Sequence, residues 1–344
     1  MKKITIKDVA KAAGVSYATV SNVINGKGQM TGKTREKVRS HIQRMNFHPD
    51  GSARALVSGK SNTVAFISKY PTSPFVTGIF AGVESELYDT GNSHLTLNHI
   101  STKNSRTIKQ KLINDLLYGK RADALIILTI KPDDSQIKEF KKAGIPIVMI
   151  ENKAVAGTNS VRIDNFKGAY NAVEYLLKKG KKNISIITGP TGLSEGGEDE
   201  SPSLGERLSG YTEALRYNGV EFDRSRVYSA KHYTQEEGVK MFDAILREKP
   251  DTDAIFCAAG DMASLGIIHR AKQIGVRIPQ DIALIGYDDI QISAFITPAL
   301  TTVRQPLDTM GRKAFDLAMD MLKRKTKGAH EILIMPELVI RESA

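Results

Sequence analysis

Residues 5–25 read TIKDVAKAAGVSYATVSNVIN, and their pattern predicts the fold of the N-terminal part of the chain. Thr5 is a suitable N-cap, and the apolar stripe over 6–13 predicts a first short helix. Gly14 ends that helix, and Ser16 is placed to cap a second helix directly afterwards. Two short helices joined by so brief a turn are typical of a helix-turn-helix unit.

The second helix directs Val20 and Val23 inward, so the same periodicity leaves a polar face outside. That face consists of Tyr17, Ala18, Ser21 and Asn22. In helix-turn-helix proteins the second helix enters the major groove of DNA, where its N-terminal residues meet the base edges. Tyr, Ser and Asn can form hydrogen bonds there, and Asn pairs well with adenine. A third helix, capped by Thr31 or Thr34 with Val38 in its apolar stripe, completes a three-helix head.

Positive charge is concentrated in the same region. Residues 1–60 carry 12 Lys and Arg against 3 Asp and Glu, which is +9 of the net charge of +11 on the whole chain. A basic segment of this kind suits a polyanion, because each phosphate contact releases condensed counterions. Charge alone leaves a second interpretation open, in which the basic head only helps solubility.

Several protein classes are disfavoured by the sequence. The length of 344 residues indicates two or three domains. We find no apolar run near the ~20 residues of a membrane span and no signal-peptide core, so we expect no membrane association. The single cysteine, Cys257, fits the reducing cytosol, and we expect a cytoplasmic, nucleoid-associated protein. Phosphate-binding, zinc-binding and nucleophile motifs are missing, so we expect no cofactor, no metal and no enzymatic activity.

Beyond residue 61 short apolar runs alternate with longer amphipathic segments. The expected strands are Thr63–Ser68, His94–Asn98, Asp123–Leu128, Ile145–Ile150, Ile184–Thr188, Asp253–Ala258 and Ile282–Gly286. The expected helices are Phe75–Thr90, Arg106–Tyr118, Asn165–Lys179, Arg207–Asn218, Gln235–Arg247 and Met262–Ile274. This alternation predicts parallel α/β sheets, and the pattern restarts near 161–164, which predicts two doubly wound lobes. Ligands of such sheets bind beyond the carboxyl ends of the strands, so we expect a binding cleft between the lobes.

The head resembles the lactose-repressor (LacI/GalR) family in an ungapped run over 7–25, and again over 33–38 and 45–49. The body resembles the sugar-binding body of the same family. Its markers are Asn183–Pro190, Arg207–Tyr211, Gly260–Gly266, Gly286–Asp289 and Leu300–Pro306. The resemblance therefore covers nearly the whole chain, and its motifs are specific.

The resemblance implies a particular domain organisation. An α-helical helix-turn-helix DNA-binding domain is expected at 1–48, a hinge helix at 49–60, and an effector-binding α/β body at 61–344 that is like the periplasmic binding proteins. Within this body we expect two doubly wound parallel-sheet lobes, an N-lobe of about 61–162 and 293–329 and a C-lobe of about 163–292 and 330–344.

The resemblance also implies the DNA contacts. They are Thr5, Ser16, Tyr17, Ala18, Thr19, Ser21, Asn22, Asn25, Thr34, Ala53 and Leu56. Leu56 falls where the family has a hinge leucine that wedges into the minor groove, a device that trades base stacking for contact area. Asn22 departs from the family, which most often has an arginine there, so the usual operator sequence is in doubt. A palindromic operator of double-stranded DNA reflects a two-fold protein, so we expect a homodimer.

The effector site implied by the resemblance consists of Phe75, Glu151, Arg207, Asp261 and Asp288. An arginine fork opposite a carboxylate, here Arg207 and Asp288, suits a polyhydroxylated ligand. The expected function is a repressor of carbohydrate-utilisation genes that responds to a sugar or a sugar phosphate. Three alternatives stay open, namely a partner protein as effector, a binding module without sequence-specific DNA binding, and an enzyme on a doubly wound fold.

Overall fold

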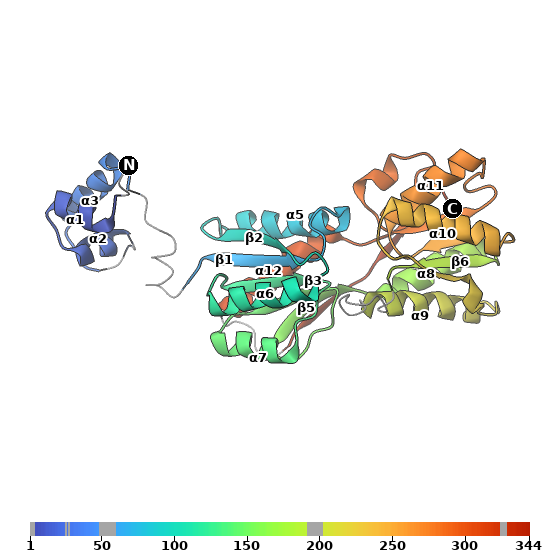
Figure 1. Cartoon of the computed structure of the whole chain (residues 1–344), viewed down its shortest axis with the longest axis horizontal. Coiled ribbons are helices and arrows are strands. Elements are labelled where there is room, and N and C mark those ends of the chain that lie inside the picture. The colour runs from blue at the N-terminus through green and yellow to red at the C-terminus, as the bar shows by residue number, and fades with distance from the viewer. Residues whose placement is uncertain (1–3, 25, 27, 48–59, 191–201, 324–328) are drawn as a thin grey trace. The chain divides into compact units, whose positions relative to one another are not determined.

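The computed structural model describes residues 4–24, 26, 28–47, 60–190, 202–323 and 329–344 (Figure 1). The chain forms two compact units, 1–61 and 62–344. Three residues of the predicted DNA-contact set, Asn25, Ala53 and Leu56, lie outside the described residues, as does the predicted hinge over 49–59.

The smaller unit is a three-helix head made of α1 (Ile6–Ala13), α2 (Tyr17–Ile24) and α3 (Gly32–Arg44). Thr5 caps α1 and forms a capping box with Asp8, and Gly14 ends the helix in the left-handed region at φ 60°. The Oγ of Ser16 accepts from the backbone N–H of Thr19 at 3.1 Å, which caps α2. Thr31, rather than Thr34, is the N-cap of α3. The core consists of Val9, Ala10, Ala13, Val20, Val23, Val38 and Phe47. The predicted helices and the helix-turn-helix connection are confirmed.

The larger unit contains two sheets, and the first sheet defines the N-lobe (62–163, 307–323 and 329–334). Its six strands are all parallel and follow the order β11-β5-β4-β3-β1-β2. Their bounds are β1 (Thr63–Ser68), β2 (Thr96–Ser101), β3 (Ala124–Leu128), β4 (Ile147–Ile150), β5 (Thr158–Ile163) and β11 (Glu331–Ile334). Helices α5 (Pro74–Asp89) and α12 (Leu307–Leu322) pack on one face, and α6 (Arg106–Tyr118) and α7 (Asp134–Ala143) pack on the other. Because both faces are covered, β1 is apolar on both sides.

The second sheet defines the C-lobe (165–190, 202–304 and 337–344). Its order is β12-β10-β9-β8-β6-β7, and only β12 runs antiparallel, against β10. The bounds are β6 (Ile184–Thr188), β7 (Val227–Ser229), β8 (Ala254–Cys257), β9 (Ala283–Asp288), β10 (Thr301–Arg304) and β12 (Glu337–Val339). Helices α8 (Asn165–Lys178) and α9 (Pro202–Tyr217) pack on one face, and α10 (Gln235–Glu248) and α11 (Asp261–Ile274) pack on the other. Two short 3-10 turns, η1 (Arg224–Arg226) and η2 (Gln291–Ala294), complete the lobe.

Each predicted strand and helix overlaps an observed element, and the predicted fold class is confirmed. The prediction missed five strands and two helices: β5, β7, β10, β11, β12, α7 and α12. The missed strands β7 and β12 have 3 residues each, which is too short to show a period.

The chain crosses between the lobes three times, and the last two predicted lobe boundaries are wrong. The first crossing lies at Asp164, next to the predicted boundary, because β5 ends at Ile163 and α8 begins one residue later. The second crossing follows β10 rather than preceding residue 293, because β10 pairs with β9 in the C-lobe sheet. The third crossing follows β11 rather than residue 329, because β11 pairs with β5 in the N-lobe sheet. Strand pairing therefore places both segments in the opposite lobe to the one predicted.

Over the part of the chain that the structure describes, none of the helices combines the length and the apolar character that a membrane span requires.

Candidate nucleic-acid interface and ligand cavity

The outer face of α2 presents the predicted base-reading residues. Tyr17 is 50% exposed, Ala18 and Asn22 are exposed, and Ser21 is half-buried, whereas Val20 and Val23 lie in the core of the head. Gly28 has a φ of +84° and lies against the side chain of Asn22, which a larger residue there would crowd. The face is therefore accessible and polar, as a helix that reads DNA bases requires.

Four of the predicted DNA contacts, Thr5, Ser16, Thr19 and Thr34, lie at the N-terminal ends of the three helices. Thr5 caps α1, the hydroxyls of Ser16 and Thr19 share a hydrogen bond of 2.9 Å at the start of α2, and Thr34 lies in the first turn of α3. Free backbone N–H groups gather at helix N-termini, which makes these positions suitable for phosphate oxygens. The hydroxyls themselves are engaged in capping, so part of their role is to fix the three helices.

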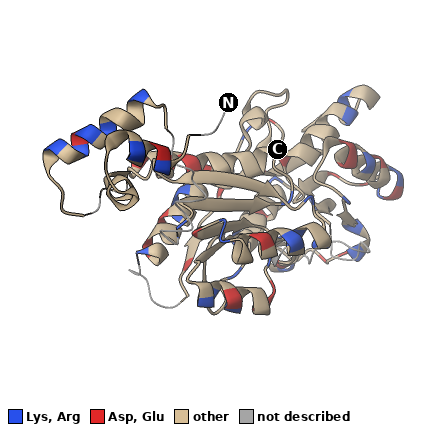
Figure 2. Cartoon of the chain, turned by 60° about the vertical axis from the view of Figure 1, so that its left-hand side comes forward, with Lys and Arg blue, Asp and Glu red and all other residues tan. Residues whose placement is uncertain are grey.

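The head also carries many exposed cations. In the described part of the head they are Lys7, Lys11, Lys33, Arg35, Lys37, Arg39 and Arg44, and all are exposed. Five of them, Lys33, Arg35, Lys37, Arg39 and Arg44, belong to α3, and Figure 2 shows Lys and Arg in blue along the chain. Only two described acidic residues, Asp8 and Glu36, accompany them in this unit, and Asp8 is engaged in the capping box of α1.

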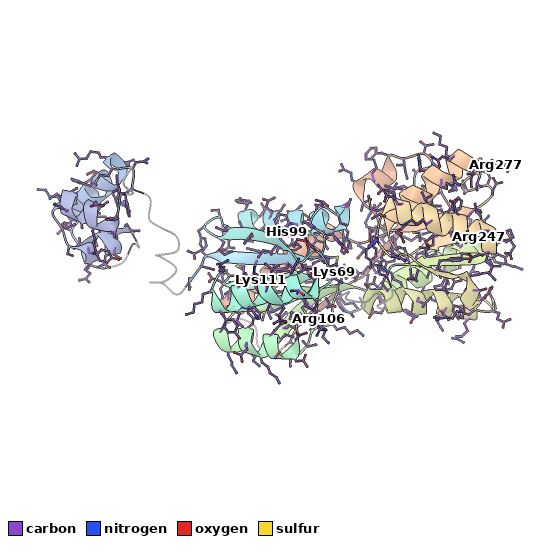
Figure 3. All side chains as sticks on the ribbon, in the orientation of Figure 1. Lys69, His99, Arg106, Lys111, Arg247 and Arg277 are labelled. Carbon is purple, nitrogen blue, oxygen red and sulfur yellow. The ribbon has the colours of Figure 1, made fainter. Side chains whose placement is uncertain are left out.

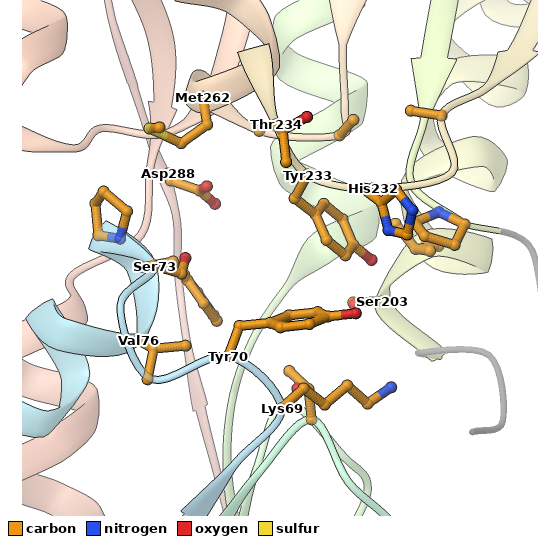
Figure 4. A pocket seen from close by; sticks show the side chains of 18 of the residues that line it. Lys69, Tyr70, Ser73, Val76, Ser203, His232, Tyr233, Thr234, Met262 and Asp288 are labelled. Carbon is orange, nitrogen blue, oxygen red and sulfur yellow. The ribbon is translucent and has the colours of Figure 1, made fainter. Parts of the chain in front are cut away.

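The larger unit contains a cavity of about 920 Å³ between the N-lobe and the C-lobe (Figure 4). The N-lobe lines it with Lys69, Tyr70, Thr72, Ser73, Pro74, Phe75, Val76, Asn104, Thr129 and Glu151. The C-lobe and the crossing after β10 line it with Pro190, Ser203, Leu204, Arg207, Ser229, Ala230, Lys231, His232, Tyr233, Thr234, Gln235, Ala259, Gly260, Met262, Asp288, Ile290 and Gln305. Most of these residues follow the carboxyl end of a strand, which is where doubly wound sheets bind ligands.

Four of the five predicted effector residues line this cavity: Phe75, Glu151, Arg207 and Asp288. They come from the start of α5, the end of β4, α9 and the end of β9, so only the folded arrangement of both lobes brings them together.

Arg207 is the centre of a buried polar network. The residue is only 6% exposed, and its guanidinium carbon lies 3.6 Å from the centroid of the Tyr287 ring. Its Nε donates to the side-chain oxygen of Asn165 at 2.8 Å, and its Nη1 donates to the carbonyl of Ala258 at 2.8 Å. Asn165 in turn donates to Glu151 at 3.0 Å. Arg207 is thus held rigidly against the cavity, and two of its donor nitrogens are already committed within the protein.

Glu151 is buried at the first crossing between the lobes. The backbone N–H of Ile163 and the amide of Asn165 each donate to one of its carboxylate oxygens. Burial raises the pKa of Glu151, and the nearby positive charge of Arg207 opposes this shift. Because Glu151 also has a φ of 66°, its backbone is constrained in the left-handed region. Glu151 thus joins the end of β4 to the start of α8 in addition to lining the cavity.

Asp288 lies opposite this network at the end of β9. The Nε2 of Gln305 donates to its Oδ1 at 2.5 Å. Burial raises the pKa of Asp288 to about 8, despite the opposing effect of Arg207. Gly260 makes room for the carboxylate, because a Cβ at this position would stand 2.8 Å from Asp288 Oδ2.

Asp261 does not line the cavity and is a structural residue. It is fully buried, and its carboxylate accepts from the N–H of Ile290 and the hydroxyls of Ser293 and Thr302 at 3.1, 2.7 and 2.6 Å. These bonds tie the start of α11 to η2 and β10. The prediction failed because the strand end that carries Asp261 was expected to face the cleft, whereas η2 covers it.

Sequence reasoning found Phe75 but missed two other aromatic residues of the cavity, Tyr70 and Tyr233. Tyr70 follows β1 and Tyr233 follows β7, and Figure 4 shows both rings in the cavity together with His232. The ring of Tyr233 packs on Gly189, where a Cβ would stand 2.5 Å from it. No sequence signal identified this segment because β7 itself was not predicted. Figure 3 shows a further missed residue, Lys69, at the end of the N-lobe that faces the C-lobe.

An ion-pair cluster connects the lobes beside the cavity. Arg162 on β5 is 7% exposed, and its Nη1 donates to both carboxylate oxygens of Glu206 on α9, at 3.1 and 3.3 Å. Its Nη2 donates to Glu331 on β11 at 3.1 Å, and Lys153 lies 3.6 Å from Glu206. Glu206 directly precedes Arg207, so the same turn of α9 carries an inter-lobe contact and a cavity residue.

Comparison with known proteins finds matches that cover almost the whole chain. Residues 5–50 match the model of bacterial regulatory proteins of the lacI family, and residues 173–344 match the periplasmic binding protein-like domain. The transcriptional repressor PurR of Proteus mirabilis (strain HI4320) is 32% identical over 98% of this chain and 96% of its own length. The chain belongs to the LacI family.

Other relatives of this LacI-family protein agree. The transcriptional regulator CelR of Thermobifida fusca is 32% identical over 99% of this chain and 98% of its own length. A structure of CelR in complex with cellobiose has a TM-score of 0.73 at 30% identity, covering 99% of this chain and 100% of that one. A lac repressor dimer bound to operator and the anti-inducer ONPF has a TM-score of 0.83 at 24% identity, with 99% of each chain covered, and this likeness establishes the fold alone.

The protein is accordingly a DNA-binding transcriptional regulator with an effector-binding domain. Its named relatives are regulators of transcription rather than enzymes, which confirms that part of the sequence prediction. Within the described residues we find no cluster of three or more His, Cys, Asp or Glu that could hold a metal ion.

Proposed function

We propose that this LacI-family protein represses carbohydrate-utilisation genes as a cytoplasmic homodimer bound to a palindromic operator on the nucleoid. A sugar in the cavity between the lobes controls that binding. The observation that carries the proposal is the cavity itself, in which Arg207 and Asp288 face the ligand space beside the rings of Tyr70, Phe75 and Tyr233. Polar groups at the wall and aromatic faces together suit a molecule with hydroxyl edges and apolar ring faces.

Two relatives support this assignment. CelR is bound to cellobiose in its structure, and the lac repressor structure is a dimer on operator DNA with ONPF. For this chain we propose the same partners by class, namely a sugar, a second copy of the chain and a palindromic duplex.

We propose three functional regions: a DNA-binding domain at 1–48, a hinge at 49–60 and an effector-binding domain from residue 61 onward. On the head, Tyr17, Ala18, Ser21 and Asn22 read bases, while the residues at the helix N-termini and Asn25 bind the backbone. Asn22 favours adenine where the family's arginine favours guanine. The operator of this protein therefore differs from the usual family operator at that base.

Control of DNA binding requires coupling between the cavity and the two heads. A sugar that bridges the walls of the cavity favours one arrangement of the lobes over another. In a dimer, a change in lobe arrangement alters the spacing of the two heads and the order of the hinge. Coupling free energies of this kind are typically ~1–3 kcal/mol, so operator affinity is expected to change by roughly 5–150-fold on sugar binding.

The proposal is tested by operator selection with the full chain, followed by fluorescence anisotropy on the selected palindrome and a random duplex, with and without sugars. We expect a clear preference for the palindrome that one sugar class alters. Arg207→Ala should abolish the sugar response and leave DNA binding intact. Arg247→Ala, an exposed arginine of the C-lobe far from the N-lobe (Figure 3), is the matched control. Equal affinity for palindrome and random duplex under all conditions would refute the proposal.

Leu56 and Ala53 remain proposed hinge contacts that rest on the family resemblance. A leucine wedge in the minor groove stabilises a kinked duplex through added contact area. Leu56→Ala is therefore expected to weaken operator binding without changing sugar affinity, measured on the same palindrome. Unchanged operator affinity would remove Leu56 from the interface.

A further inference from the structure

Five exposed side chains gather at the end of the N-lobe that faces away from the cavity. They are Tyr118 at the end of α6, Lys120 and Arg121 directly after it, and Lys141 and Lys142 in the last turn of α7. The segments that carry them precede β3 and β4, so they lie at the amino ends of these strands, whereas the cavity lies at the carboxyl ends. We call these five residues the entry-end patch.

The patch is one surface, although two helices supply it. Helices α6 and α7 cover the same face of the N-lobe sheet, and β3 and β4, which follow them, are paired neighbours (Figure 1). The hydrogen bond to Glu139 raises the pKa of Lys142, and Tyr118 adds to this shift. The phenol at the end of α6 therefore lies close to the cations at the end of α7.

Most of the positive charge of the patch is not neutralised within the chain. Lys142 pairs with Glu139 at 2.7 Å. Lys120, Arg121 and Lys141 form no ion pair with the residues that the structure describes. The exposed cations are interleaved with Tyr118, which is 72% exposed and can donate a hydrogen bond through its hydroxyl. This combination of groups suits a polyanion.

The backbone of Lys120 gives independent support for a role outside the fold. Its φ is 49°, in the left-handed region, which a glycine would adopt without a steric cost. The side chain is exposed and has no hydrogen bond or ion pair with the described residues, so it does little to stabilise the turn. A strained position that carries an outward cation is typical of a binding surface.

The patch lies beside the point where the larger unit begins. This unit starts at Asn62, whose backbone N–H donates to Asp123 Oδ2 at 2.8 Å. The backbone N–H of Asp123 donates in turn to the carbonyl of Thr63 at 2.8 Å. Asp123 follows Arg121 by two residues, so the patch adjoins the segment that leads to the DNA-binding head.

We propose that the entry-end patch is a second DNA contact, which binds backbone phosphates of the duplex that the head holds. Lysine, arginine and a phenol hydroxyl suit phosphate oxygens, and phosphate contacts carry no sequence information by themselves. The patch therefore adds affinity without adding specificity. This inference rests on the proposed binding of DNA by the head, and in a homodimer each subunit supplies one patch.

The test is the salt dependence of DNA affinity in the full chain. Fluorescence anisotropy is measured on the selected palindrome and on a random duplex from about 0.05 to 0.3 M salt, with the parent and with Lys120→Ala/Arg121→Ala/Lys141→Ala. Each lost phosphate contact reduces the slope of log affinity against log salt by roughly 0.9, so one lost contact per subunit reduces it by about 1.8. We expect affinity at roughly 0.1 M salt to fall about tenfold or more, by the same factor on both duplexes.

A second triple variant provides the matched control. Lys179→Ala/Lys181→Ala/Lys182→Ala removes the same charge at the amino end of β6, and the amino ends of the C-lobe strands also point away from the cavity, at the opposite end of the larger unit. Its salt slope should equal that of the parent. Cations at helix C-termini also offset the helix dipole, so Tm is compared for all variants and should change little, as expected of surface substitutions.

Glu139→Gln provides a change of opposite sign that does not depend on the triple variant folding well. It removes the carboxylate that pairs with Lys142 and leaves a fourth cation of the patch without an ion-pair partner. DNA affinity should therefore rise and the salt slope should become steeper. The expected rise is the same on palindrome and random duplex, because the contact is to phosphate.

The possible outcomes separate this inference from the proposed function. An unchanged slope in the patch variant overturns the DNA contact and leaves an acidic protein as the polyanion that the patch would fit. An equal loss in the control variant also overturns it, because net charge alone would then explain the effect. If the parent shows no preference for the palindrome, the proposed function fails, whereas a reduced slope on the random duplex still supports the patch.

Discussion

The ion pair between Arg162 and Glu206 allows a sharp test of how the two lobes are held together. Arg162 belongs to the N-lobe sheet and Glu206 to α9 of the C-lobe, so their contact exists only while the lobes keep the described arrangement. Glu206→Gln removes the negative charge and preserves the shape of the side chain. We expect this substitution to lower the free energy of unfolding of the 62–344 unit.

The magnitude follows from burial and geometry. Arg162 is 7% exposed and makes two contacts with Glu206, of 3.1 and 3.3 Å. Hydrogen bonds to charged groups contribute ~1.5–3 kcal/mol. Glutamine can still accept one bond, Glu331 still neutralises Arg162, and the Glu206 side chain is 24% exposed. We therefore expect a loss of about 1–2 kcal/mol, which lowers Tm by roughly 2–3 °C for a unit of this size.

The same helix provides the control. Glu213 on α9 pairs with Arg216, but the two side chains are 37% and 70% exposed. Exposed pairs contribute about 0–1 kcal/mol, so Glu213→Gln should leave Tm almost unchanged. Both variants and the parent are compared by calorimetric or circular-dichroism melting, and Arg162→Met completes a double-mutant cycle with Glu206→Gln. If Glu206→Gln costs no more than Glu213→Gln, or the cycle shows no coupling, the inter-lobe pair is not a stabilising contact.

Three further predictions concern the head and the cavity. Val38→Ala removes two buried methyl groups from the three-helix core, so it should destabilise the head by about 2 kcal/mol. Operator binding should weaken, whereas the rise in Tm of the larger unit on sugar binding should stay the same. A change in that rise would contradict the separation of the two units. Tyr17→Ala and Asn22→Ala alter exposed side chains, so the free energy of unfolding of each variant should stay within about 0.5 kcal/mol of that of the parent. Discrimination between palindrome and random duplex should fall by about 1–3 kcal/mol for each lost base contact, and unaltered discrimination would remove that residue from the reading face. Asp288→Asn should flatten the pH dependence of stability. Burial raises the pKa of Asp288 to about 8, so the folded chain retains a proton that the unfolded chain has lost, and parent stability falls as pH rises from about 4 through about 8. Parallel curves of Tm against pH for parent and variant would contradict this assignment.

Features that depend on neighbouring residues could be predicted from the sequence. The caps at Thr5 and Ser16, the turn at Gly14 and the inward positions of Val20 and Val23 follow from local backbone chemistry and helical periodicity. For the same reason, the long apolar strands and amphipathic helices of the larger unit could be predicted, and with them the doubly wound lobes. Family motifs then located Arg207 and Asp288.

Which polar groups face the ligand depends on contacts between distant parts of the chain. Asp261 and Asp288 both follow apolar strands, but η2 and β10 cover the first and leave the second in the cavity. Tyr233 and Gln305 follow strands of 3 and 4 residues, whose positions depend on pairing with distant strands rather than on any local pattern. Burial and hydrogen-bond satisfaction depend on contacts between residues far apart in the chain. A sequence read one window at a time contains no information about them.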